Sequence, residues 1–131
     1  MVVFGEAVLQ QVGGVNMGLD QYAYWVKEDE EPVEFKYWRK TSHIDNWMRQ
    51  RFFAKGGESE DGFNGERLYL TENDISDFLQ DIEDENLEWV PGFFFGGEYS
   101  VKEHKAEDKF FALQCLGHLR KGRKVYYQNS W

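Results

Sequence analysis

Residues 33–54 constrain the fold most, because two periodicities meet there within a few positions. From residue 33 to 38, Val33, Phe35 and Tyr37 alternate with neighbours of the other strand face, which is the period of two that is typical of a strand. From Ser42 onward, apolar residues fall on one helical stripe, and Ser42 followed by Asp45 forms a capping pair. A strand that runs straight into a helix therefore predicts a mixed fold.

The rest of the chain continues this pattern of short strands and amphipathic helices. We predict strands at 18–26, 33–40, 66–70, 89–97 and 124–131, the fourth central because its three adjacent phenylalanines must point to both faces. We predict helices at 43–54, after Thr71, and at about 100–121, where Ser100 and Glu103 form a capping box. The predicted core residues of the last helix are Phe110, Leu113, Leu116 and Leu119.

This order of elements favours an α+β two-layer sandwich, in which a mostly antiparallel sheet carries about three helices on one face. A length of 131 residues is that of one ordinary domain, which we place at 17–131. Residues 1–16 form a mildly apolar leader that precedes the domain.

Charge and cysteine content narrow the class of protein. The formal net charge of −9 disfavours nonspecific nucleic-acid binding and binding to an anionic membrane surface. The single cysteine, Cys115, permits no disulfide framework, and no apolar run reaches the length of a membrane span. We expect a cytoplasmic protein, either a monomer or a homodimer.

The junction between strand and helix is the main candidate site. Unpaired backbone N–H groups at a helix start favour an anion, and Arg39, Lys40 and His43 lie beside this one. With Ser42 as a further donor and Tyr37 and Trp38 as flanking aromatic surfaces, the segment could hold a phosphate or carboxylate. The alternative is structural, with Arg39 and Lys40 paired to acidic segments.

Catalytic and metal signals are weaker. Asp20 lies in a predicted strand and could form an acid–base pair with His43, although the simpler interpretation, which we favour, is a buried aspartate that caps a turn. The three histidines lack metal-ligand spacing, and residues 92–97 lack the Gly-Lys-Ser/Thr of a phosphate loop. We therefore predict no metal and no cofactor.

Residues 71–88 hold eight acidic side chains and no basic one. Such a helix could imitate the phosphates of DNA and inhibit a nucleic-acid-binding complex of a host cell. More simply, it is the solvated face of an amphipathic helix.

Four short motifs resemble those of a family of small uncharacterised bacteriophage and prophage proteins. The matching segments are Met17 to Tyr22, Tyr37 to Lys40 with His43 and Trp47, Gly92 to Gly96, and Val125 to Trp131. The resemblance implies a phage accessory protein of the infected cell, without an assigned reaction, that could counteract host defence. We therefore expect a non-enzymatic protein that binds a host protein or a small anionic, nucleotide-like ligand. The alternatives are the acidic decoy and a small hydrolase or transferase that uses His43.

Overall fold

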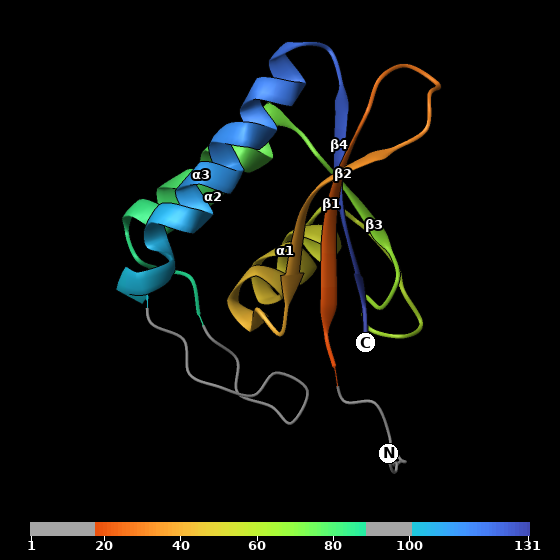
Figure 1. Cartoon of the computed structure of the whole chain (residues 1–131). Coiled ribbons are helices and arrows are strands. Elements are labelled where there is room, and N and C mark those ends of the chain that lie inside the picture. The colour runs from red at the N-terminus through yellow and green to blue at the C-terminus, as the bar shows by residue number, and fades with distance from the viewer. Residues whose placement is uncertain (1–17, 89–100) are drawn as a thin grey trace.

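A computed structural model describes residues 18–88 and 101–131, the side chains of 101–103 excepted (Figure 1). The predicted leader at 1–16, the predicted strand at 89–97 and the predicted capping box of Ser100 and Glu103 lie outside the described residues and side chains. Within these residues the element order is β1, β2, α1, β3, α2, α3, β4.

Four antiparallel strands form one sheet in the order β2-β1-β4-β3. The strands are β1 (Asp20–Val26), β2 (Val33–Arg39), β3 (Arg67–Leu70) and β4 (Lys124–Ser130). The last strand therefore lies in the middle of the sheet, between the first and third strands. This arrangement brings residues a hundred positions apart into register, for example Tyr24 opposite Tyr126.

All three described helices lie on one face of this sheet (Figure 1). They are α1 (Ser42–Ala54), α2 (Glu72–Glu83) and α3 (Val101–Arg120). The predicted α+β architecture, with helices on one side of an antiparallel sheet, is confirmed. No helix in the described part of the chain is long and apolar enough to cross a membrane.

The helix ends follow from local sequence. Thr71 and Asp74 exchange side-chain and backbone hydrogen bonds, which is a capping box at the start of α2. Gly56, at φ +89°, closes α1 with a bond to the carbonyl of Phe53, and the N–H of Gly57 bonds to the carbonyl of Phe52. Gly57 also has no room for a side chain, because a Cβ would stand 2.6 Å from the ring of Phe52.

The core side of α3 differs from the prediction. Phe110 and Leu113 were predicted as core, but they are 64% and 55% exposed. Leu116 and Leu119, predicted with them, do pack against the core, and the buried residues of α3 with described side chains are Asp108, Phe111, Ala112 and Cys115. The helix has two apolar stripes about half a turn apart, and the stripe that contains Phe111 packs against the sheet. The ring of Phe111 packs on that of Trp38, with the two centroids 4.7 Å apart. Tertiary contacts therefore determine which of the two apolar stripes is buried.

Candidate functional site

The predicted anion-binding residues on β2 point to opposite faces of the sheet. Tyr37 and Arg39 lie on the face away from the helices, whereas Trp38 is buried between the sheet and α3. The strand period of two requires this separation, because neighbouring side chains alternate between faces. Tyr37, Trp38 and Arg39 therefore do not form a single pocket.

The remaining three predicted residues lie at the start of α1. Lys40 is exposed and takes a left-handed backbone conformation with φ 58°, while Ser42 and His43 are each only 1% exposed. The N-cap is Thr41, which makes no side-chain cap bond. Instead, the side-chain amide of Gln21 pairs with the backbone N–H and carbonyl of Thr41 at 2.8 and 3.0 Å.

The predicted capping pair of Ser42 and Asp45 is corrected by the structure. Asp45 is 2% exposed, and its carboxylate points into the sheet, where it accepts hydrogen bonds from Tyr127 at 2.8 Å and Asn129 at 2.6 Å. The Tyr127 hydroxyl in turn accepts a bond from Gln21 at 3.0 Å. Asp45 thus anchors the first turn of α1 to β4. It does not cap the helix, whose N-cap residue is Thr41.

Burial raises the pKa of Asp45, and the hydrogen bonds from Tyr127 and Asn129 only partly offset that rise. A raised pKa in the folded state means that the native protein holds its proton more tightly than the unfolded chain. The contribution of Asp45 to stability is therefore full below the ordinary aspartate pKa and is lost as the pH rises through the raised value.

We expect the change Asp45→Asn to remove this pH dependence, because both hydrogen bonds end on one oxygen that an amide also provides. Urea unfolding of both proteins between about pH 4 and pH 8 checks it. The free energy of unfolding of the native chain should fall relative to the variant as the pH rises above about 4, and then level off. A constant difference between the two proteins would contradict the raised pKa.

The acid that contacts His43 is Asp108. The Nε2 atom of His43 lies 3.0 Å from a carboxylate oxygen of Asp108, and this pair joins α1 to α3 with both side chains buried. Asp20, the predicted partner of His43, accepts a hydrogen bond from Tyr37 at 2.7 Å and lies 3.8 Å from Arg39. The candidate acid–base pair is therefore His43 with Asp108.

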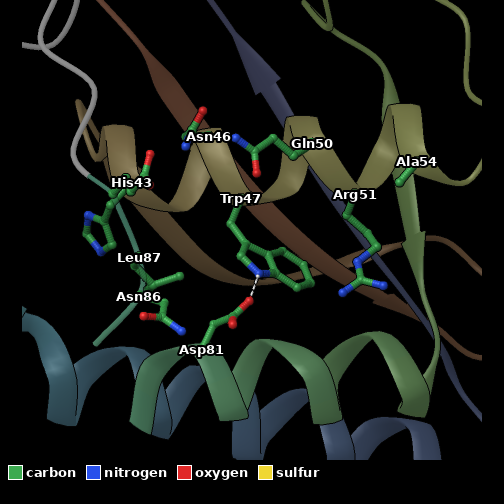
Figure 2. A pocket seen from close by; sticks show the side chains of 10 residues that line it. His43, Asn46, Trp47, Gln50, Arg51, Ala54, Asp81, Asn86 and Leu87 are labelled. Carbon is green, nitrogen blue, oxygen red and sulfur yellow. Dashed lines mark hydrogen bonds between the residues drawn. The ribbon is translucent and has the colours of Figure 1, made fainter. Parts of the chain in front are cut away.

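His43 also lines a cavity of about 410 Å³ between α1 and the end of α2 (Figure 2). Trp47 points across it and donates a hydrogen bond to Asp81 at 2.8 Å, and Arg51 lies at the opposite end from His43. The Arg51 guanidinium is already bound by Asp77 at 3.0 Å. The rest of the lining consists of three amides, the acid Glu88, and the apolar residues Ala54 and Leu87, so the cavity does not favour an anion.

The acids of segment 71–88 bind mainly within the protein. Asp74 pairs with Lys55, and although burial alone would raise its pKa, that bond and the capping bonds from Thr71 lower it below the usual value. Glu83 pairs with Lys109, whose hydrogen bond lowers the pKa of the carboxyl. The further internal contacts of these acids are Glu72–Arg120, Asp77–Arg51, Asp81–Trp47, Asp84–Gln80 and Glu85–Lys105.

The sheet face away from the helices carries five tyrosines, and we call this the tyrosine face. Strand register aligns its residues in two rows that cross all four strands. The first row is Tyr37, Tyr22, Gln128 and Arg67, and the second is Glu34, Tyr24, Tyr126 and Tyr69.

Ring contacts hold the tyrosine face in a fixed arrangement. Tyr126 lies at its centre, 2% exposed, with its ring 4.9 Å from that of Tyr24 and 5.2 Å from that of Tyr69. The guanidinium of Arg67 lies 4.6 Å from the centroid of the Tyr126 ring. Tyr37, in the other row, is 48% exposed and Tyr69 is 46% exposed, so the edges of the face remain open to a partner.

Three tyrosines of this face have a pKa above the ordinary tyrosine value. Burial raises the pKa of Tyr24 and of Tyr126, and the hydrogen bond to Asp20 raises the pKa of Tyr37. The Tyr37 hydroxyl already donates to Asp20 at 2.7 Å, whereas a tyrosine in general offers both a hydroxyl donor and the apolar area of its ring.

The sequence predicted the strands that carry these tyrosines but not their common face. The signal was present as Tyr22 and Tyr24, two residues apart, with Tyr126 in another strand. Placing these tyrosines on one face requires knowing which strands are neighbours in the sheet. The strand order β2-β1-β4-β3 provides that information, and the sequence alone does not.

Among the described residues, no group of three or more His, Cys, Asp or Glu side chains gathers in a way that could hold a metal ion. Cys115 is fully buried, and this burial raises the pKa of its thiol, so it behaves as a small core residue. Comparisons with protein-family models, with curated proteins and with solved structures found no match to this chain.

Proposed function

We propose that the chain is a non-enzymatic binding protein whose tyrosine face binds a partner protein. The observation that carries this proposal is the pair of rows in which five tyrosines and Arg67 line the sheet face away from the helices. Tyrosine and arginine are enriched among the residues that dominate protein–protein binding energy. A soluble domain that needed this face only for folding would be expected to place polar side chains there.

The physical properties of the face fit a protein better than a small ligand. A tyrosine loses little conformational entropy when it is immobilised, and it offers both a ring and a hydroxyl donor. The face is a sheet surface rather than an enclosed cavity, so it suits a partner that lies across several strands. We expect a partner surface with apolar side chains at its centre and carbonyl or carboxylate acceptors for the phenols.

Nucleic acid is the other polymer that stacks on aromatic residues of a sheet. The formal net charge of −9 opposes a phosphate backbone, and the two rows contain one basic side chain, Arg67, against the acid Glu34. A protein partner is therefore favoured over nucleic acid.

The cellular setting of the proposal rests on the sequence resemblance to bacteriophage proteins. It supports a host bacterial protein in the cytoplasm as the partner, and interference with host defence as the purpose. The small anionic ligand is less favoured, because the residues that would hold it, such as Trp38 and Arg39, lie on opposite faces of β2. The acidic decoy is also less favoured, since most of its carboxylates are bound to side chains of this chain.

The test is affinity capture from a bacterial lysate with the tagged full chain. The double variant Tyr37→Ala, Tyr69→Ala removes the two most exposed tyrosines of the face, and Phe53→Ala, 41% exposed on α1, is the matched control. We expect a stoichiometric host protein that is retained by the native chain and by the control but lost from the double variant. Equal retention by all three proteins would overturn the proposal, and a retained nucleotide in native mass spectrometry would favour the anionic ligand.

A second candidate function rests on the contact between His43 and Asp108 beside the cavity. A histidine hydrogen-bonded to a carboxylate can act as a general base in a hydrolase or transferase. That function predicts turnover in a panel of phosphoesters and esters that is lost in His43→Gln while the variant remains folded. A folded native chain that is inert toward the panel would count against catalysis.

A further inference from the structure

The outer side of α3 carries an exposed apolar stripe. Its members are Ala106, Phe110, Leu113 and Gly117, all exposed, with Phe110 at 64% and Leu113 at 55%. They lie opposite the side of α3 that packs into the core. A Cβ built on Gly117 meets nothing within 4 Å, so that end of the stripe is open as well.

The spacing of the stripe is that of a helix-pairing seam. Positions 106, 110, 113 and 117 are separated by four, three and four residues, which keeps side chains on one line along a helix that packs at a shallow angle against another. The stripe therefore fits another helix better than it fits a flat surface.

We propose that α3 pairs antiparallel with α3 of a second copy of this chain. The stripe is complementary to itself in that direction, because a two-fold axis between residues 111 and 112 sets each residue opposite its size match. Phe110 then packs on Leu113 of the second copy, and Ala106 on Gly117. The small residues at both ends let the two helices approach while the large ones fill the centre.

Charge on one flank of the stripe favours the same direction. Glu107 is exposed near the start of α3, and Lys121 is exposed just beyond its end. In the antiparallel pair these two residues lie on the same side of the seam, one from each copy, and their side chains lean toward each other because each points toward the start of its own helix. A parallel pair would instead put Glu107 and Lys121 about fourteen residues apart along the seam, or roughly 21 Å, and would align the helix dipoles unfavourably.

The seam is short, so the dimer should be weak. Three side chains and one glycine from each copy make a contact below the size of a standard protein–protein interface, which places the dissociation constant on the order of micromolar or weaker. Because α3 lies in the helix layer, such a dimer leaves both tyrosine faces free. Two faces on one dimer would strengthen binding to a partner that is itself repeated.

Sedimentation velocity over a range of concentrations tests the association, with Leu113→Glu as the variant and Phe53→Glu as its matched control on α1. We expect the native chain and the control to shift from monomer toward dimer as the concentration rises to about 1 mM, and Leu113→Glu to remain a monomer. A native chain that is monomeric throughout, or a dimer that Leu113→Glu leaves unchanged, would overturn the proposal.

Engineered cysteines test the direction of the pair, and Cys115 does not interfere because it is buried. Ala106→Cys combined with Gly117→Cys should give an oxidised covalent dimer, since these positions face each other in the antiparallel pair. Ala106→Cys alone should not, because the two copies of residue 106 then lie about eleven residues apart, or roughly 16 Å. A covalent dimer from Ala106→Cys alone would mean that the helices pair in parallel.

Discussion

Replacing Phe111 by alanine should lower the free energy of unfolding by about 3–5 kcal/mol, the cost of truncating a fully buried aromatic side chain. Phe111 is 1% exposed and contacts the ring of Phe35 from β2, that of Trp38 from β2 and that of Phe78 from α2. The truncation would leave a cavity where α3, α2 and the sheet meet. Urea unfolding followed by far-UV circular dichroism measures the change.

Phe110 provides the control, since it is the same residue type one position earlier in the same helix. It is 64% exposed, so Phe110→Ala should change the free energy of unfolding by no more than about 0.5 kcal/mol in dilute protein. Equal losses from the two variants would mean that α3 does not use the face with Phe111 to pack on the sheet.

Replacing Asp45 by alanine should cost about 2–3 kcal/mol, because it leaves the hydroxyl proton of buried Tyr127 without its acceptor. The side-chain NH2 group of Asn129 loses one of its two hydrogen bonds and keeps the one to the carbonyl of Phe63 at 2.9 Å. The same variant releases the first turn of α1 from β4, so amide exchange at the start of that helix should quicken.

The contrast with Asp45→Asn separates the hydrogen bonds from the charge. Asparagine keeps an acceptor oxygen for Tyr127, so it should retain most of the stability that alanine loses. The double variant Asp45→Ala, Tyr127→Phe should regain little stability over Asp45→Ala, because loss of the hydroxyl leaves a side-chain N–H of buried Gln21 without its acceptor. An Asp45→Ala protein as stable as the native chain would contradict the role of this buried network.

Local sequence was sufficient to predict most of the described elements. The switch in period near Ser42 correctly located the end of β2 and the start of α1, and Thr71 marked the start of α2 through its own capping bonds. These features depend on residues within a few positions of one another, which is why a single sequence reveals them.

The candidate sites were harder to predict, because each depends on contacts between distant segments. The contact of His43 with Asp108 joins α1 to α3, and the two residues are 65 positions apart. Asp45 matched a local capping pattern, but Tyr127, 82 positions away, offered its carboxylate a stronger partner in the core. The wrong prediction for α3 has the same cause. Contacts with the sheet determine that Phe111, and not Phe110, is the core residue.

Binding of the captured host protein, measured by calorimetry against the tyrosine-face variants, tests the central claim most directly. We predict that Tyr37→Ala, Tyr69→Ala weakens the affinity by about 30-fold or more, as expected when an interface loses residues that dominate its energy. Phe53→Ala should bind as the native chain does, since its side chain lies on α1. Native affinity in the double variant, with its fold intact, would show that the partner binds elsewhere and would contradict the account.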